Sequence, residues 1–227
     1  IPLEVHYVNF LLTKETARVS SGLTLSISEP CVAVGVGALG SQIVDNLTRS
    51  GVSEWTLIDE DTFLPHNVAR HVLTSAFVGL PKAEAVAAYL TDTIKGSPID
   101  AYSADIVGPL PSELQEKLNL ASVIFDFSTS LAAARYLARD LPGASGRRIS
   151  VFLSPAGNSL VILAEDKCRT VRLDHLEMQY YRMLCESDEF KDHLKSQSTR
   201  FRFGTSCRDV SYILGQSMVG HQAGLSA

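Results

Sequence analysis

The sequence predicts an α/β protein in which a mostly parallel sheet carries helices on both faces, with a C-terminal helical insertion outside the sheet. Short apolar runs rich in β-branched residues alternate with amphipathic helical stretches from residue 31 to about residue 165. A glycine-rich turn joins the first clear apolar run to a helical stretch. Beyond residue 165 a helical pattern continues in heavily charged surroundings, which indicates a region outside the main sheet.

The first unit of the sheet combines strand, turn, helix and strand. Cys-Val-Ala-Val-Gly at 31–35 is a short apolar run stopped by glycine, as expected of a buried parallel strand. The helical stretch that follows carries its apolar residues on one face, and we expect it to end at Gly51. Trp-Thr-Leu-Ile-Asp at 55–59 predicts the second strand, so the segment forms a right-handed βαβ unit.

The alternation continues along the chain. We expect helices over residues 81–94, 112–119 and 130–141, and strands over residues 99–106, 122–127, 147–154 and 158–166. Pro81 suits a first helical turn, where the missing N–H of proline costs no hydrogen bond.

The chain divides into three parts by pattern. Residues 1–30 are expected to form an N-terminal arm with a helix, and residues 31–165 a nucleotide-binding domain. Residues 166–227 are expected to form a helical, cysteine-containing region packed on the same domain. Within it, apolar residues recur at helical spacing from Leu173 to Leu184, and a last helix is expected over residues 207–220.

Composition and charge exclude several classes of protein. The chain has 227 residues, of which 45% are hydrophobic and 20% charged, as in ordinary globular proteins. Its net charge is −5 and its basic residues are scattered, so we expect neither a nucleic-acid partner nor a membrane surface. No apolar run reaches the roughly 18 residues of a membrane span, and no secretory signal is visible. Four cysteines without a CxxC pair suit a reducing cytoplasm, which is the expected location.

The glycine turn is a candidate nucleotide site. Gly35, Gly37 and Gly40 form GxGxxG between a strand and a helix, where phosphates can approach bare backbone N–H groups. Asp59 ends the second predicted strand about 20 residues beyond the loop, where a carboxylate can hold the ribose hydroxyls. This pattern is Rossmann-like and fits NAD or ATP equally well.

Polar residues after the second strand favour ATP. Asn67 and Arg70 are three residues apart, so on a helical turn they would project from the same face. Lys82 follows at the start of the next predicted helix. An amide, a guanidinium and an ammonium near a glycine loop suit a triphosphate whose leaving pyrophosphate needs its charge neutralised.

These segments resemble the ThiF, MoeB and HesA group, the adenylation fold of ubiquitin-activating enzymes. The matching pieces are Gly-Val-Gly-Ala-Leu-Gly-Ser at 35–41, the segment 57–71, and Gly-Leu-Pro-Lys-Ala-Glu-Ala-Val at 79–86. The middle piece follows the group's D-x-D-x-V-x-x-x-N-x-x-R pattern, with Phe63 in place of the valine. The resemblance covers roughly residues 31–165, and its motifs occur in the order and spacing of the group.

The resemblance implies ATP-dependent adenylation of the C-terminal carboxylate of a ubiquitin-like protein. In the group the glycines hold the phosphates, and the aspartate matching Asp59 binds the ribose. The residues matching Asn67, Arg70 and Lys82 contact the phosphates, and Asp61 matches a second acidic position. A homodimer is also implied. The segment Pro-His-Asn-Val-Ala-Arg-His is similar to bacterial members fused to conjugating-enzyme-like or JAB modules, some of them active in anti-phage defence, which implies a conjugating-enzyme-like acceptor.

One motif departs from the group. The group carries D-x-x-D-N after a later strand, with the second aspartate on Mg²⁺, whereas this chain has Asp126 followed by Thr129 and Ser130 at the replaced positions. Asp126 is therefore the expected Mg²⁺ ligand; the alternative is a weaker metal site or lost activity. The paired CxxC motifs of zinc-binding relatives are missing, so Mg²⁺ is the one metal expected.

Cys207 is the candidate nucleophile for a thioester step. It opens the last predicted helix after Thr205 and Ser206 and has Arg208 beside it, a setting that lowers a thiol pKa. The alternative is a small buried helix residue. For Cys31, Cys168 and Cys185 we expect structural or incidental positions, and for His66 and His71 a polar or packing role rather than metal binding.

Two other functions remain open on the sequence. An NAD-dependent oxidoreductase could use the same loop and Asp59. A non-catalytic scaffold could keep the fold without the second aspartate.

Overall fold

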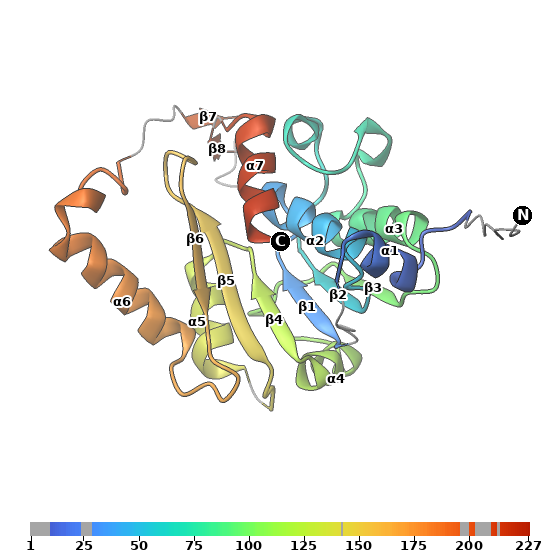
Figure 1. Cartoon of the computed structure of the whole chain (residues 1–227), viewed down its shortest axis with the longest axis horizontal. Coiled ribbons are helices and arrows are strands. Elements are labelled where there is room, and N and C mark those ends of the chain that lie inside the picture. Colours follow the sequence, from blue (N-terminus) through green and yellow to red (C-terminus); the bar gives the residue numbers. More distant parts are fainter. Residues whose placement is uncertain (1–9, 24–28, 142, 196–199, 203–209, 213) are drawn as a thin grey trace, which may run out of the picture.

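A six-stranded sheet forms the centre of the protein, in the order β3-β2-β1-β4-β5-β6 (Figure 1). The computed structural model describes residues 10–23, 29–141, 143–195, 200–202, 210–212 and 214–227. The strands are β1 (Cys31–Val34), β2 (Trp55–Ile58), β3 (Ile99–Tyr102), β4 (Val123–Asp126), β5 (Arg147–Leu153) and β6 (Leu160–Ala164). The first five strands are parallel, and β6 runs antiparallel to β5. The predicted mostly parallel sheet is confirmed.

The strand order reverses beside β1. Cys31 pairs with Trp55 of β2 on one side and with Val123 of β4 on the other. The strands β2 and β3 therefore lie on one side of β1, and β4 and the later strands lie on the other side. In open α/β sheets such a switch point opens a crevice outside the carboxyl ends of the strands, where ligands bind. The glycine turn after β1 and Asp126 at the end of β4 lie at this edge.

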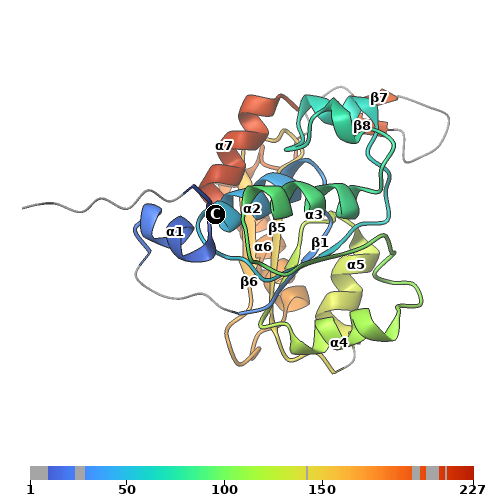
Figure 2. The same ribbon diagram turned by 90° about the vertical axis from the view of Figure 1, so that its right-hand side faces the viewer.

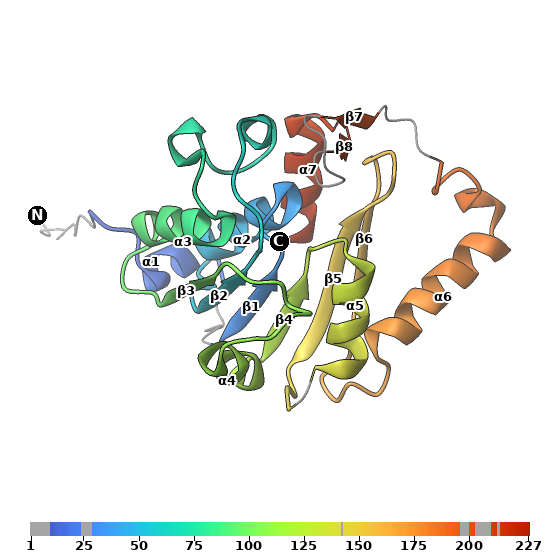
Figure 3. The same ribbon diagram turned by 180° about the vertical axis from the view of Figure 1, so that it is seen from behind.

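Helices cover both faces of the sheet. They are α1 (Lys14–Ser20), α2 (Ala38–Arg49), α3 (Lys82–Thr93), α4 (Ser112–Leu120), α5 (Leu131–Arg135), α6 (Leu173–Glu186) and α7 (Gln216–Ser226). Figure 2 shows α1 and α7 on the opposite side from α4 and α5, and Figure 3 shows α5 in front of β5 when the protein is seen from behind. No helix in the described part of the chain is long and apolar enough to cross a membrane.

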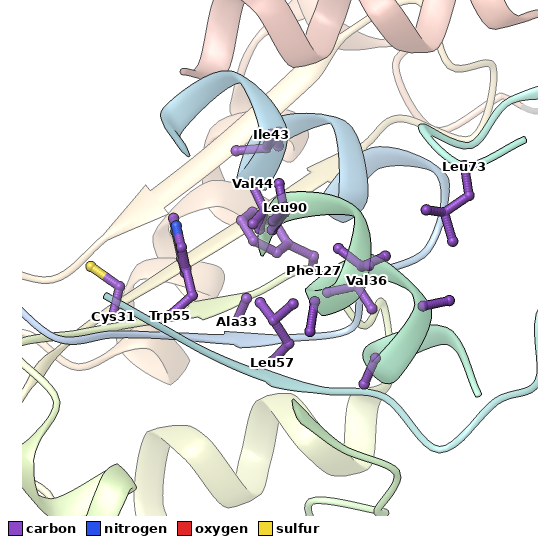
Figure 4. Packing of buried hydrophobic residues seen from close by; sticks show 14 of the residues in the cluster. Cys31, Ala33, Val36, Ile43, Val44, Trp55, Leu57, Leu73, Leu90 and Phe127 are labelled. Carbon is purple, nitrogen blue, oxygen red and sulfur yellow. The ribbon is translucent and has the colours of Figure 1, made fainter. Parts of the chain in front are cut away.

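The larger core lies between the sheet and helices α2, α3 and α7. Ala33 of β1 and Leu57 of β2 are fully buried there, together with Val44 of α2 and Leu90 of α3 (Figure 4). A second cluster on the opposite face joins β1, β2 and β4 to α4 and α5. Both faces of the central strands are therefore buried, which explains why these strands are apolar throughout rather than alternating.

Helix α6 packs on β5 and β6 and is tied to the sheet by a buried ionic network. The Glu165 carboxylate is fully buried and accepts hydrogen bonds from the backbone N–H groups of Arg148 and Leu173. Arg169 forms an ion pair with the same carboxylate at 2.6 Å. Because Leu173 is the first residue of α6, Glu165 positions the start of this helix.

The C-terminal prediction was wrong in one part. Residues 207–220 were expected to form one helix, but β8 (Val210–Tyr212) is extended and pairs antiparallel with β7 (Arg200–Arg202), and α7 begins at Gln216. A β-branched and an aromatic residue in β8 favour an extended backbone, and Gly215 separates the strand from the helix. The division into parts 1–30, 31–165 and 166–227 stays a prediction.

Candidate functional site

The glycine turn has two positions where only glycine fits. Gly35 has φ +86°, and a Cβ there would lie 2.8 Å from the backbone of Ser128, in the turn after β4. A Cβ on Gly40 would lie 2.3 Å from the Gly35 carbonyl oxygen. At Gly37 a Cβ would meet no described atom within 4 Å, so this backbone faces open space at the start of α2. Gly35 and Gly40 are thus packed tightly against neighbouring backbone, whereas Gly37 faces open space. A loop that binds phosphate requires such an open backbone position.

Both polar groups of the Val36 backbone are held by side chains from later segments. The Val36 N–H donates to Asp59 Oδ2 at 2.8 Å, and the Val36 carbonyl oxygen lies 2.7 Å from His71 Nε2. His71 Nδ1 accepts a hydrogen bond from the Leu73 N–H at 3.2 Å. Since Nδ1 is an acceptor, the proton of the neutral imidazole is on Nε2, which donates to Val36. Asp59 and His71 therefore clamp the loop.

Burial shifts the pKa of both clamping side chains. Burial raises the pKa of the Asp59 carboxyl above its usual value, opposed by the Lys82 ammonium and by hydrogen bonds from the Asp61 and Val36 N–H groups. Burial lowers the pKa of His71 to about 4, and the positive charge of Lys82 adds to this effect. His71 is therefore neutral near pH 7, as its two hydrogen bonds require.

Lys82 lies within electrostatic reach of both residues of the clamp. Its Nζ donates to Asp61 Oδ2 at 2.7 Å, and its backbone N–H donates to the Asp61 carbonyl oxygen at 2.9 Å. The lysine is 9% exposed although it is the first residue of α3. The ammonium acts electrostatically on Asp59 and His71, while its own charge is paired with Asp61.

Asn67 and Arg70 lie in the segment between β2 and α3. Asn67 Oδ1 accepts a hydrogen bond from the Leu64 N–H at 2.8 Å and so caps the 3-10 turn Pro65–Ala69. Arg70 ends the turn with φ −152°, outside the helical region, and its N–H donates to the Asn67 carbonyl oxygen at 3.1 Å. That the two side chains share a face stays a prediction. The Arg70 carbonyl oxygen accepts a hydrogen bond from Gln42 Nε2 of α2 at 3.0 Å. Burial lowers the pKa of the Arg70 guanidinium.

Asp126 is buried at the carboxyl end of β4, at the same sheet edge as the glycine turn. Its Oδ1 accepts from the Ser128 hydroxyl at 2.6 Å and from the Ser128 N–H at 3.0 Å. Burial raises the pKa of this carboxyl, and the two bonds from Ser128 oppose the shift. Thr129 and Ser130 occupy the two positions where the motif of the group is not kept. The Thr129 backbone is in the left-handed region with φ 54°, and the Ser130 hydroxyl caps the N-terminus of α5.

This donor set fits Mg²⁺ only in combination with a ligand. Asp126 offers carboxylate oxygen, which Mg²⁺ prefers, and Mg²⁺ is commonly held by one or two carboxylates together with substrate phosphates. Among the described residues no group of three His, Cys, Asp or Glu side chains could hold a metal by itself.

The sequence did not identify the contact that braces the helix after the glycine turn. Gln42 of α2 donates to the side chain of Gln216 of α7 at 3.2 Å, and Gln216 donates back at 3.4 Å. Figure 1 shows α7 beside α2. A pair of residues so far apart in the chain leaves no local signal. The polar or packing role expected for His71 agrees with its burial and its two hydrogen bonds.

The cysteines differ in their surroundings. Cys31 is buried at the start of β1, and burial raises the pKa of its thiol to about 12. Cys168 and Cys185 are exposed. Cys207, the candidate nucleophile, lies outside the described residues.

Comparison with known proteins gives consistent results. The model of the ThiF family matches residues 21–143. The chain is 33% identical over 100 residues to the ATP-dependent ubiquitin transferase-like protein Cap2 of Enterobacter hormaechei, a match covering 44% of this chain and 16% of the relative. It is 29% identical over 119 residues to the adenylyltransferase and sulfurtransferase UBA4 of Yarrowia lipolytica, covering 52% of this chain and 29% of the relative. The chain thus spans less than a third of the length of these relatives.

A solved structure shows the same fold. E. coli MccB, determined with AMPCPP and MccA, superposes with a TM-score of 0.59 and 16% identity, over 87% of this chain and 53% of that one.

Proposed function

The chain belongs to the ThiF family, and on that premise we propose that it uses ATP to adenylate the C-terminal carboxylate of a ubiquitin-like protein. The observation that carries the proposal is the clamped glycine turn, whose Val36 is held by Asp59 and His71 while Gly37 faces open space. The names of the relatives support the same activity, since Cap2 is ubiquitin transferase-like and UBA4 is an adenylyltransferase.

The proposed binding mode follows the strand order. Asp59 after β2 holds the ribose, and the N–H groups of the turn from Gly35 to Gly40 hold the phosphates at the start of α2. Lys82 and Arg70 supply positive charge to the triphosphate, and the amide nitrogen of Asn67 is a further donor. Asp61 keeps Lys82 oriented through their 2.7 Å ion pair. Bound Mg²⁺, held by Asp126 and the phosphates, would neutralise phosphate charge.

The proposed reaction is a displacement at the α-phosphorus. An oxygen of the partner's terminal carboxylate forms a bond to phosphorus, the bond to the bridging oxygen breaks, and its electron pair leaves with pyrophosphate. The product is an acyl adenylate. A carboxylate is already ionised at neutral pH, so the protein needs no general base, and positioning and charge stabilisation supply the acceleration.

The later steps are finer proposals. The acyl group passes from the adenylate to the Cys207 thiol, which loses its proton and displaces AMP to form a thioester. A conjugating-enzyme-like protein is the proposed acceptor. A homodimer and a cytoplasmic location complete the proposal.

ATP–pyrophosphate exchange with a ubiquitin-like protein of the same cell tests the first step. We expect Arg70→Ala and Lys82→Ala to abolish exchange, and Cys207→Ala to retain it while losing a thiol-sensitive adduct. Lys95→Ala is the matched control, because Lys95 is partly exposed and pairs with Asp92 at the C-terminal end of α3, the end opposite Lys82. Tight AMPCPP binding without exchange would support a scaffold instead, and tight NAD binding without exchange would support an oxidoreductase.

A further inference from the structure

A cavity of about 380 Å³ lies between α5, α6 and the last two strands of the sheet. Its floor is formed by β5 from Ser150 to Leu153, and α6 contributes residues one helical turn apart, Leu173, Glu177 and Tyr181. Asp126, Thr129 and Ser130 form the wall at the end of β4. The volume is within the range of about 300–1,000 Å³ that is typical of ligand pockets.

The cavity adjoins the proposed nucleotide site on the side away from the ribose. Along the sheet edge the order is Asp59 after β2, the glycine turn after β1, Asp126 on β4, and then the cavity beside β5. The glycine turn and the turn after β4 are in close contact, since a Cβ on Gly35 would lie 2.8 Å from the Ser128 backbone. A ligand in the cavity therefore reaches the proposed phosphate site from the β4 side of the glycine turn, whereas Asp59 lies on the β2 side.

The walls of the cavity suit an apolar side chain better than an acidic one. Leu131, Ala134 and Phe152 are among its apolar lining residues, and Leu131 is 65% exposed at the start of α5. Arg135 is the one cation among the described lining residues, and it is ion-paired with Glu177 across the cavity. Asp174, also in the lining, is paired with Arg172 at 3.0 Å. An acidic ligand group would therefore meet carboxylates and a guanidinium that is already neutralised.

The helix on one side of the cavity changes geometry at Arg135. The α-helix Leu131–Arg135 continues as one turn of π-helix over Tyr136–Asp140. Such π turns occur frequently at functional sites.

We infer that this cavity binds an apolar side chain from the C-terminal segment of the adenylated substrate, so that the terminal carboxylate reaches the nucleotide beside Asp126. The inference rests on the proposed function and adds to it a preference for substrate sequence. The occupant is a peptide segment because it must end in the reacting carboxylate while its preceding residues continue over β5.

Fluorescence polarisation with short labelled peptides tests the inference in the presence of saturating AMPCPP. The peptides have a free C-terminal carboxylate and a Gly-Ser background, with Leu, Gly or Glu placed in turn at each position near the C-terminus. At one position we expect the Leu peptide to bind at least roughly 10-fold more tightly than the Gly or Glu peptide, as burial of one leucine side chain provides.

Two substitutions on α5 provide a matched pair. Ala134→Trp fills the cavity and is expected to remove the Leu preference, whereas Ala132→Trp, on the same helix but exposed and outside the cavity, is expected to keep it. Leu131→Glu is a second cavity variant with little risk to folding, because a carboxylate is favoured in the first turn of a helix. This variant should also weaken binding of the Leu peptide. Glu177→Gln releases Arg135 and is expected to increase binding of the Glu peptide.

The outcomes separate the inference from the proposed function. If AMPCPP binds but the Leu preference is missing, or survives in folded Ala134→Trp and Leu131→Glu variants, the inference is wrong and the nucleotide site stands. If the unsubstituted protein does not bind AMPCPP, the proposed function fails and the inference fails with it.

Discussion

The His71 Nε2 atom donates a hydrogen bond to the Val36 carbonyl oxygen at 2.7 Å, across 35 residues of sequence. In a trans peptide the carbonyl and the following N–H point in opposite directions. The Gly37 N–H is therefore directed away from His71, at a position where the backbone faces open space. His71 is in this way a positioning residue, which orients a donor of the phosphate loop.

His71→Ala is expected to weaken AMPCPP binding by roughly 10-fold, the effect of losing a hydrogen bond to a buried group. His71→Gln keeps a side-chain N–H and should recover part of the affinity. Isothermal titration calorimetry measures both variants, with His175→Ala on α6 as a control that leaves the affinity unchanged. Equal affinities for His71→Ala and the unsubstituted protein would remove the positioning role.

The pKa of His71 also predicts a pH dependence of stability. In the folded protein this pKa is lowered to about 4 from the ordinary 6.5, so between these values the unfolded chain binds more protons. The free energy of unfolding should therefore rise with pH through this window, by up to about 3 kcal/mol from this residue. Urea unfolding at several pH values should show a flatter profile for His71→Gln, and parallel profiles would contradict the assignment.

Gly37→Ala and Gly40→Ala should separate binding from folding. A methyl group on Gly40 would meet the Gly35 carbonyl oxygen at 2.3 Å, so we expect a loss of about 1–3 kcal/mol in unfolding free energy. A methyl group on Gly37 meets no described atom within 4 Å and should cost less than about 1 kcal/mol as a helix N-cap. It should nevertheless weaken AMPCPP by at least roughly 10-fold, because it lies where the phosphates approach. The prediction fails if Gly37→Ala is unstable or binds normally.

Lys82→Met and Asp61→Asn should differ in their effect on catalysis. Lys82→Met removes the ammonium while keeping most of the side-chain volume, and exchange should fall by about 100-fold or more. Asp61→Asn removes the ion-pair partner but keeps the charge of Lys82, so we expect a fall of less than about 10-fold. The two variants are compared by their rates of ATP–pyrophosphate exchange at saturating ATP. A larger fall for Asp61→Asn would indicate that the Asp61 carboxylate itself takes part in binding or catalysis.

The central fold and much of the candidate site could be predicted from local sequence. The run Cys31–Val34, the glycine turn and Asp59 after β2 carry their signals within a few residues, because a buried strand must be apolar and a tight turn requires glycine. The region around Val210 was predicted wrongly: Val210 and Tyr212 favour an extended backbone, but the pairing with Arg200–Arg202 that completes this strand is not visible in the local sequence.

By itself the sequence determined the order of strands and helices from residue 31 to residue 165, the glycine turn and the family. Only the tertiary structure decided that His71 and Asp59 hold the same residue, that Gln42 meets Gln216 across 174 residues, and that α5 and α6 enclose a cavity beside Asp126. The physical reason is the sequence separation over which each interaction acts. Strand pattern and turn geometry act between neighbours in the chain, whereas hydrogen bonds and cavities depend on where packing brings distant segments together.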